Sequence, residues 1–382
     1  MFPLPGRGRF RRADRSDPAR FRIRPRRFLG NYRYVRLRWR LLFAAIDCLG
    51  WLLLGPWKLI QFGLEKGRSN DAAGAAPAKI LVVQLDHLGD AVISTGLVDT
   101  LARRFPDARI DVLAAPWNAA VFRMCRSVRR VRILDRNRFG GGQGWQWIAA
   151  LLSCGWKLRR HRYDIAVDVR GEFPHAVLMW LSGAKHRVGW NCGGGGFLLT
   201  ASAPYHRGRH EVLSRLALLR TLVPSAGETE VAPRLQPPAR SVRSLELRLA
   251  DAGLQPGSSV DSKSFDLLQS PSSPLVVVHV GSGTEAKRWP AWHWRELLGR
   301  LIVSHHAAVV LVGRSEDRAV AEQVLAGGAL SRVVDWTGNL SLPELAALVS
   351  RAHVAIGADS GPAHLAAALG PPTVALFSAT NN

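Results

Sequence analysis

The sequence predicts an α/β protein with two parallel-sheet domains that face each other across a cleft. The first observation behind this prediction is that short apolar runs alternate with helical segments, in two series, from about residue 79 onward. The second is a stretch rich in Gly, Ser and Pro, residues 253–274, that separates the two series. Alternation of buried strands with helices is typical of βαβ units, which form parallel sheets covered on both faces. The length of 382 residues also exceeds what one ordinary core requires.

The first series has four apolar runs that are typical of buried strands: KILVVQLD, ARIDVLAA, RRVRILD and YDIAVDVR. A helix, GDAVISTGLVDTLARRF, follows the first of these strands. A longer and mostly helical stretch extends from about residue 206 to residue 252. We therefore predict an N-terminal domain over residues 79–255 and an interdomain linker over residues 256–273.

The second series has five such runs: LVVVHVG, AAVVLVG, VVDWTG, HVAIGAD and TVALFS. Helices are expected between them from about Trp292, near Glu316, near Leu345 and over GPAHLAAALG. This series predicts a C-terminal domain over residues 274–382. In two such domains, ligands are expected in the cleft between the carboxyl edges of the sheets.

The N-terminal 78 residues differ from the rest of the chain in charge. The chain has a formal net charge of +23, and residues 1–40 hold 14 arginines against Asp14 and Asp17. Such an arm attracts anionic partners. Because it contains no recognisable base-reading motif, we expect an anionic membrane surface and no nucleic acid.

An apolar segment follows this arm. Residues 41–54 contain no basic group, but this length is short of the ~20 residues that a membrane-spanning helix needs. Trp39, Trp51 and Trp57 accompany Arg and Lys residues, a composition typical of a helix that lies in the plane of a membrane. We therefore predict that residues 1–68 form an amphipathic in-plane anchor. Two alternatives stay open: a basic tail leading into a helix that packs on the protein's own core, and a spanning helix.

The four cysteines stand apart in the sequence, without any C-x-x-C pair. Neither a zinc knuckle nor a disulfide framework is therefore indicated. A reducing, cytoplasmic compartment is expected.

The loop after the first predicted strand, LDHLGDAVIST, holds the first candidate for chemistry. The strand is expected to end near Asp86 and the helix to start near Asp90, with Gly89 permitting a tight turn between them. Asp90 would then lie at the carboxyl edge of the sheet and face the cleft. Spacing alone leaves two roles open for it, a functional carboxylate or a helix N-cap.

The second candidate is the loop HVGSGTEAKRWPAWHW, in which Gly281 and Gly283 begin a G-x-G-x-x-A spacing. A dinucleotide site is not favoured, because Pro290 predicts that the helix begins only there, after a loop of about nine residues. A glycine-rich loop with a lysine still suits a diphosphate, through backbone N–H groups and positive charge. Gly283, Thr284 and Lys287 are therefore candidate binding residues, with a solvated surface loop as the alternative.

The stretch VAIGADSGPAHLAAALG places an Asp directly before a helix. Pro362 suits the first helical position, so Ser360 and Gly361 should present exposed N–H groups at the positive helix end. Such groups favour a phosphate, which Asp359 would repel if it faced that phosphate. We therefore expect Asp359 to accept hydrogen bonds from hydroxyls of a sugar joined to a diphosphate.

Three further residues are weaker candidates. Arg314 and Glu316 follow the strand AAVVLVG and are expected near the base or ribose of a nucleotide. His364 lies in the first turn of the GPAHLAAALG helix and either points at the phosphate or fills the core.

Together these motifs resemble a known family. LGD after the first strand, KRWP in the glycine-rich loop and ADSGPAHLAAALGPPTVALF occur in this order over about residues 79–382. With these motifs in this order, the chain is similar to the glycosyltransferase family 9 heptosyltransferases of lipopolysaccharide core assembly. The resemblance implies a GT-B fold of two Rossmann-like domains, with an ADP-heptose donor held by the C-terminal domain. It also implies an acceptor held by the N-terminal domain and inversion without a metal.

The motifs also carry residue roles over from the family. The resemblance implies that Asp90 is the catalytic base and that Lys287 contacts the diphosphate. It implies that Asp359 and the Ser-Gly turn after it contact the donor sugar. His364 matches the histidine of the same family motif. The family continues beyond the ALF strand with a loop and helices, so we expect a chain ending at Asn382 to be truncated or to have an incomplete donor site.

The sequence thus predicts an inverting glycosyltransferase that moves heptose, or a related sugar, from ADP-heptose to a lipid-linked saccharide of the lipopolysaccharide core. No metal or other cofactor is expected, since no D-x-D lies at a plausible strand end. The enzyme is expected to be peripheral, at the cytoplasmic face of the inner membrane. Two alternatives stay open: a sugar-nucleotide 2-epimerase, which shares the two-domain architecture, and a non-catalytic sugar-nucleotide-binding protein.

Overall fold

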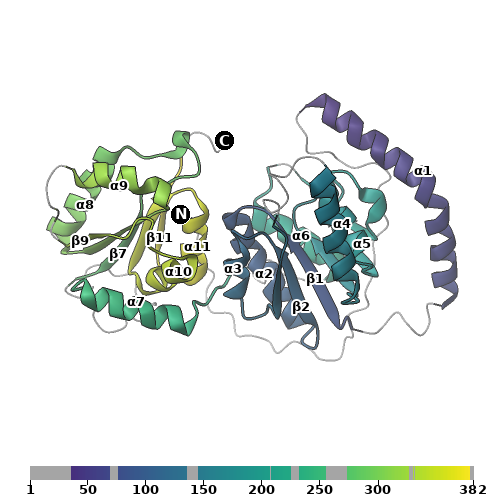
Figure 1. Cartoon of the computed structure of the whole chain (residues 1–382), viewed down its shortest axis with the longest axis horizontal. Coiled ribbons are helices and arrows are strands. Elements are labelled where there is room, and N and C mark those ends of the chain that lie inside the picture. Colours follow the sequence, from purple (N-terminus) through teal and green to yellow (C-terminus); the bar gives the residue numbers. More distant parts are fainter. Residues whose placement is uncertain are drawn as a thin grey trace.

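The chain folds into two parallel α/β domains preceded by a long helix, as predicted (Figure 1). The computed structural model describes residues 36–68, 76–135, 145–206, 208–224, 232–254, 273–326, 330 and 332–378, without the side chains of residues 57–68, 145 and 146. The predicted Arg-rich arm up to residue 35 and most of the predicted linker 256–273 lie outside these residues.

The first sheet has six parallel strands in the order β3-β2-β1-β4-β5-β6. They are β1 (Lys79–Gln84), β2 (Arg109–Ala114), β3 (Arg130–Ile133), β4 (Ile165–Asp168), β5 (His186–Trp190) and β6 (Ala201–Ala203). The four strands predicted for this domain are confirmed. The sequence did not reveal β5 and β6, because HRVGW mixes charged residues and Gly with apolar ones and ASA is too short to show alternation.

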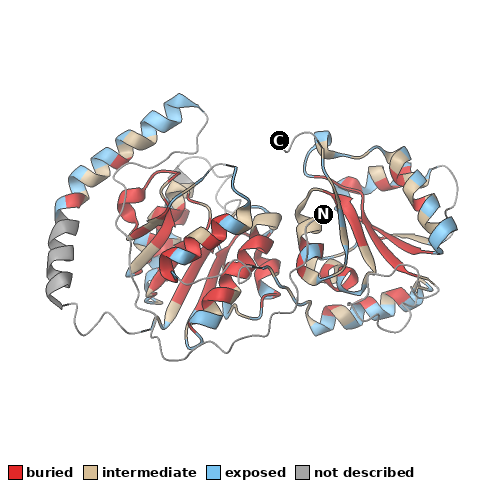
Figure 2. Ribbon diagram, turned by 180° about the vertical axis from the view of Figure 1, so that it is seen from behind, coloured by how far each residue is buried: buried red, intermediate tan, exposed pale blue. Residues whose placement is uncertain are grey.

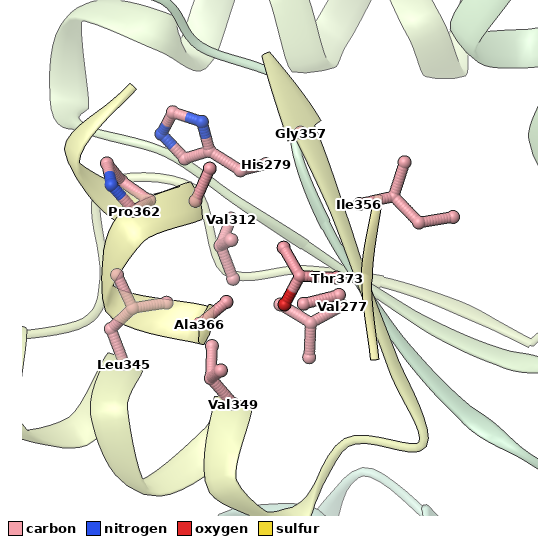
Figure 3. A pocket seen from close by; sticks show the side chains of 12 residues that line it. Val277, His279, Val312, Leu345, Val349, Ile356, Gly357, Pro362, Ala366 and Thr373 are labelled. Atoms are coloured by element: carbon pink, nitrogen blue, oxygen red, sulfur yellow. The ribbon is translucent and has the colours of Figure 1, made fainter. Parts of the chain in front are cut away.

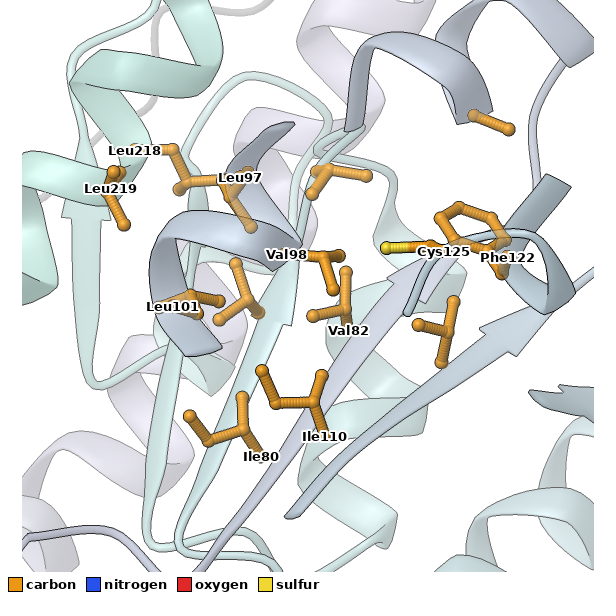
Figure 4. Close-up of a cluster of buried hydrophobic side chains, with 14 of the residues drawn as sticks. Ile80, Val82, Leu97, Val98, Leu101, Ile110, Phe122, Cys125, Leu218 and Leu219 are labelled. Carbon is orange, nitrogen blue, oxygen red and sulfur yellow. The ribbon is translucent and has the colours of Figure 1, made fainter. Parts of the chain in front are cut away.

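Helices cover both faces of this sheet. One face carries α2 (Leu88–Arg104), α3 (Ala119–Arg123) and α6 (Glu211–Leu222). Figure 4 shows side chains of α2 packed on those of β1 and β2, with Leu218 and Leu219 of α6 on the other side of α2. The other face carries α4 (Trp145–Arg159), α5 (Phe173–Leu181) and the short 3₁₀ helix η2 (Gly196–Leu198). The central strands β1, β2 and β4 are buried on both sides, which explains why their sequences are nearly continuous apolar runs.

The second sheet has five parallel strands in the order β11-β10-β7-β8-β9, and all five were predicted. They are β7 (Leu275–His279), β8 (Ala308–Val312), β9 (Val333–Asp335), β10 (Val354–Ala358) and β11 (Thr373–Leu376). One face is covered by α7 (Ala239–Asp251), α10 (Leu342–Arg351) and α11 (Gly361–Leu369). The other face is covered by α8 (Ala291–His305) and α9 (Arg318–Leu325).

The bounds of the two domains remain a prediction. Helix α7 lies within the range predicted for the N-terminal domain, but it packs on α10. Its Leu245 and Leu249 are buried in the core of the second sheet. The segment before α7 is bonded to both domains, since the N–H of Leu235 donates to Ala368 O and that of Gln236 to Met124 O.

The N-terminal helix α1 (Leu37–Arg68) lies against the first domain along one side. Asp47 is fully buried there and accepts a hydrogen bond from the N–H of Gly195 at 2.7 Å. The ring of Phe43 packs on Phe173 at 6.0 Å. One side of this helix thus packs on the protein's own core, as one of the predicted alternatives states. Among the helices of the described residues, none is both long and apolar enough to cross a membrane.

Both strand orders reverse direction along the sheet at one point, between β1 and β4 in the first sheet and between β7 and β10 in the second. At such a point the loops leaving the two central strands diverge to opposite faces, and they leave a crevice at the carboxyl edge. The loops after these four strands hold most of the candidate residues that the sequence indicates.

Candidate active site

Asp90 lies in the first turn of α2, at the carboxyl edge of the first sheet. The helix begins at Leu88 with His87 as its N-cap, two residues earlier than expected, and no side chain caps it. The N-cap alternative for Asp90 is therefore wrong. Strand β1 also ends two residues earlier than expected, at Gln84, so the turn keeps its expected length but is shifted along the chain. The side-chain amide of Asn118 and the indole N–H of Trp117 donate to the carbonyl of Asp86 and fix this turn.

Arg170 reaches this carboxylate from the loop after β4. Its guanidinium lies 2.6 Å from Asp86 and 3.9 Å from Asp90. The turn that carries Arg170 is held by the buried Asp168, which accepts hydrogen bonds from the N–H of Arg170 and of Gly171 at 2.9 Å. Burial raises the pKa of Asp86 above its ordinary value, although the charge of Arg170 opposes that shift.

A second guanidinium approaches Asp90 from α6. Arg215 is only 3% exposed and lies 3.8 Å from the Asp90 carboxylate. It also contacts Glu211 at 3.1 Å and donates to the hydroxyl of Ser94 at 3.3 Å. Asp90 thus lies between two arginines from different elements, which fixes the position of its carboxylate at the edge of the cleft.

The glycine-rich loop of the second domain ends where the sequence predicts. The chain leaves β7 through buried residues 280–282, becomes exposed from Gly283, forms the 3₁₀ turn η5 (Glu285–Lys287) and starts α8 at Ala291, with Pro290 as N-cap. Lys287 turns back toward the sheet, and its ammonium group lies 2.8 Å from the carboxylate of Asp359. Lys287 and Asp359, 72 residues apart, thus meet at one sheet edge.

The helix after Asp359 has the predicted N-terminus. Ser360 is the N-cap of α11, and Gly370 ends the helix in the left-handed region at φ 108°. Pro362 occupies the second helical position rather than the first, because the helix already begins at Gly361. The first N–H groups of a helix have no partner within it, so this end can accept an anion.

The remaining predicted donor residues lie at the same edge of the second sheet. Gly283 and Thr284 are exposed in the loop after β7, and a methyl group on Gly283 would meet no atom within 4 Å. Arg314 and Glu316 follow β8 and pair with each other at 3.3 Å, with side chains 64% and 71% exposed. The carbonyl of Thr284 accepts a hydrogen bond from the N–H of Lys287 at 3.1 Å, which places this residue beside the lysine. The role of all four residues in binding stays a prediction.

The two halves of the site meet where α2 and α11 begin. A methyl group built on Gly361 would lie 2.9 Å from Cβ of Leu88, and one built on Gly89 would lie 2.8 Å from Cδ2 of His364. The side chain of His364 is 43% exposed, so it does not fill the core, and its Nε2 lies 4.0 Å from Asp359. Leu365 and Ala368 of α11 pack into the core of the first domain. Helix α2, which carries Asp90, and helix α11, whose start can accept an anion, therefore touch at their N-termini.

A small hollow lies beneath α11, between that helix, α10 and the strands β7 and β10 (Figure 3). Its lining is almost wholly apolar, and the ring of His279 closes it at the end nearest Pro362. Burial lowers the pKa of His279 to about 4, so this imidazole is neutral at physiological pH. The hollow belongs to the packing that supports α11, and its polar lining side chains are only those of His279 and Thr373.

Among the described residues, no three His, Cys, Asp or Glu side chains lie close enough together to hold a metal ion. The four cysteines are free thiols.

Comparison with known proteins identifies the family. The family model "Glycosyltransferase family 9 (heptosyltransferase)" matches residues 151–382. The chain belongs to glycosyltransferase family 9. It is therefore a glycosyltransferase, with the two parallel-sheet domains of the GT-B architecture.

The relatives of this glycosyltransferase extend the match to most of the chain. It is 30% identical to lipopolysaccharide heptosyltransferase 2 of Escherichia coli (strain K12), over 78% of this chain and 82% of that protein. It is 26% identical to lipopolysaccharide heptosyltransferase 1 of Pseudomonas aeruginosa, over 79% of each chain.

Solved structures show the same fold. A family 9 glycosyltransferase from Veillonella parvula superposes with a TM-score of 0.68 at 19% identity, over 80% of this chain and 82% of that chain. The E. coli ADP-heptose lps heptosyltransferase II superposes with a TM-score of 0.62 at 24% identity, over 78% and 84% of the two chains.

Two residues of the site escaped the sequence analysis. Arg170 follows a predicted strand end, DVRGE, so the position that singled out Asp90 could also have singled out this arginine. Arg215 gave no signal, because an isolated arginine in a helix is ordinary. Only the packing of α6 on α2 reveals that it reaches Asp90.

The close approach of Gly361 to Leu88 predicts that Gly361→Ala lowers the activity of the glycosyltransferase without destabilising its fold. Alanine favours a helix more than glycine does, and the position needs no positive φ. The added methyl must push α11 away from α2, however, because it meets Cβ of Leu88. A displacement of this size at a reacting geometry costs roughly tenfold to a hundredfold in kcat/KM.

Gly299→Ala on α8 is the matched control, because a methyl group there meets nothing within 4 Å. Its kcat/KM should equal that of the parent in the same steady-state assay. Equal activity of the Gly361→Ala protein would show that the two helices need not touch during turnover.

Proposed function

We propose that this glycosyltransferase moves a heptose from ADP-heptose to a saccharide of the lipopolysaccharide core, with inversion at the transferred carbon and without a metal. The proposed donor and acceptor classes rest on the relatives, which are lipopolysaccharide heptosyltransferases. Their sequence similarity covers about four fifths of this chain. The contact between the N-termini of α2 and α11 carries the proposal, since it holds the candidate base beside the candidate donor site.

In this mechanism Asp90 acts on the acceptor. An acceptor hydroxyl attacks the anomeric carbon of the heptose on the face opposite the diphosphate, and its proton passes to the carboxylate of Asp90 as the new bond forms. The bond from the anomeric carbon to the diphosphate oxygen breaks, and ADP leaves with that electron pair. Arg170 and Arg215 keep the carboxylate turned into the cleft during this step.

The second domain stabilises the leaving group. The negative charge that develops on ADP is met by the ammonium of Lys287 and by the N–H groups at the start of α11. Asp359 accepts hydrogen bonds from the hydroxyls of the heptose. The ion pair between Lys287 and Asp359 orients both side chains before the donor binds.

We place this reaction at the cytoplasmic face of the inner membrane, where the lipid-linked acceptor is presented. The four free thiols fit a reducing compartment.

A panel of nucleotide sugars tests the proposal. ADP-heptose should raise the melting temperature of the protein, and transfer to a core saccharide should release ADP in equal amount. UDP-N-acetylglucosamine should do neither. Stabilisation without turnover would favour a non-catalytic binding protein, and acceptor-independent conversion of a UDP-sugar would favour an epimerase.

The metal-free mechanism predicts that EDTA leaves the rate of transfer unchanged. The charge of the leaving diphosphate is neutralised by Lys287 and α11, so no divalent cation is needed for that purpose. The measurement is the initial rate with and without ~5 mM EDTA, a usual excess over trace metal. Loss of activity that added Mg²⁺ restores would overturn the mechanism.

A further inference from the structure

From Leu41 to Leu53 the outward side of α1 is apolar, although the helix lies at the surface. Its exposed large side chains include Leu41, Leu49, Leu52 and Leu53, which are 56–74% exposed. From residue 41 to residue 56 the sequence has one charged residue, Asp47, and that residue is buried on the inward side. Figure 2 shows the exposed residues along this helix. A continuous exposed apolar side of this kind indicates a partner.

Helix α4 also has exposed apolar side chains. Ile148, Leu152 and Trp156 recur every four residues on its outward side and are 49–63% exposed. Trp180 of the neighbouring helix α5 is 46% exposed. Side chains of α1, α4 and α5 all join the core cluster on one face of the first sheet. Within this group α4 packs on α5, and both α5 and α1 pack on η2.

Basic side chains border this group of helices. Arg36, Arg38 and Arg40 are exposed at the start of α1, and Lys157 and Arg159 are exposed at the end of α4. The first turn of α1 contains no acidic residue. Apolar side chains flanked by exposed basic groups match an anionic bilayer, whose headgroups attract the cations while its acyl region receives Leu and Trp.

We infer that the outward sides of α1, α4 and α5 form one docking surface for an anionic lipid bilayer, with Trp156 and Ile148 inserting beside the leucines of α1. A second copy of the chain fits this surface less well. A dimer would bring two such surfaces with their basic borders together, and the net charge of +23 opposes close association. The inference goes beyond the proposed function, because it concerns where the protein lies and not what it transfers.

The inference is tested by measuring how the full chain binds to lipid vesicles. The vesicles contain phosphatidylcholine with roughly 30% phosphatidylglycerol, an anionic content that attracts basic helices. Two double variants probe the two helices, Leu52→Glu with Leu53→Glu on α1 and Ile148→Glu with Trp156→Glu on α4. Each should weaken the partition coefficient by at least about tenfold, because an apolar side chain leaves the acyl region and a charge replaces it. Leu247→Glu with Val303→Glu is the matched control. Both residues are exposed and apolar, but they belong to helices α7 and α8 of the second domain.

The control should bind like the parent, and every variant should keep the parent's turnover of a soluble acceptor. That assay separates failure of the docking surface from failure of the proposed function. Trp156→Gln adds no charge and should give a smaller loss in the same direction, which guards against misfolding of the double variant. Parent-like vesicle binding by the α4 variants would remove α4 from the surface. Parent-like binding by both double variants, or a dimer in solution that the Glu substitutions dissociate, would overturn the inference.

Discussion

Asp90→Asn is expected to lower kcat by roughly 10²–10⁴-fold, the usual cost of losing general-base catalysis. The amide keeps the shape of the carboxylate but cannot take the proton of the acceptor hydroxyl. The fold should survive, since Arg170 keeps its contact with Asp86 and Arg215 keeps its contact with Glu211. Helix α2 loses only the small favourable interaction of a carboxylate with its N-terminus, about 0.3–1 kcal/mol.

Steady-state kinetics with a saturating donor, together with thermal unfolding in the presence of ADP, check this prediction. Asp107→Asn is the matched control, because it is the same exchange at an exposed position just beyond the other end of α2. It should leave kcat unchanged. An Asp90→Asn protein that turns over normally but unfolds at lower temperature would mean that Asp90 only anchors the two arginines.

The fold could be predicted because the buried strands of parallel sheets leave a strong signal. The runs around Ile80 and Val277 are apolar on both faces of the sheet, and helices separate them at regular intervals. Neither β5 nor β6 gives that signal, since the sequence of β5, HRVGW, mixes charged residues and Gly with apolar ones and β6 has only three residues. The strand order cannot be derived from local patterns either, because it depends on which strands pair across long crossovers.

Residues of the candidate site could be predicted where they follow a strand end in the sequence. They were missed where they reach the site only through the packing of distant elements. Asp90, Lys287 and Asp359 each follow a strand end, which the sequence reveals. Arg215 reaches the site only through the packing of α6 on α2, for which no local signal exists. The N-cap alternative for Asp90 failed for a related reason. Side chains from the β2–α3 loop fix the turn after β1, and they lie more than 25 residues away in the sequence.

Lys287→Ala is expected to weaken the binding of ADP by about 1.5–3 kcal/mol, the range for a hydrogen bond to a charged group. The structure gives a reason for the loss to be large. Lys287 is an ion-pair partner of Asp359, so its removal also takes away positive charge from beside the Asp359 carboxylate at the start of α11. The charge of that carboxylate would repel the diphosphate. Calorimetry with ADP measures the effect, and adenosine, which has no phosphate, should bind both proteins equally.

A double-mutant cycle with Asp359→Asn separates the two contributions. If Lys287 contacts the diphosphate directly, Lys287→Ala should still weaken ADP binding when residue 359 carries no charge. If the lysine only neutralises Asp359, the same substitution should cost nothing in the Asp359→Asn background. In the proposed mechanism the first result holds, since the leaving group needs a cation at the moment its charge develops. Unchanged ADP affinity of Lys287→Ala in both backgrounds would remove this lysine from the donor site and leave the N-terminus of α11 as its anion-binding element.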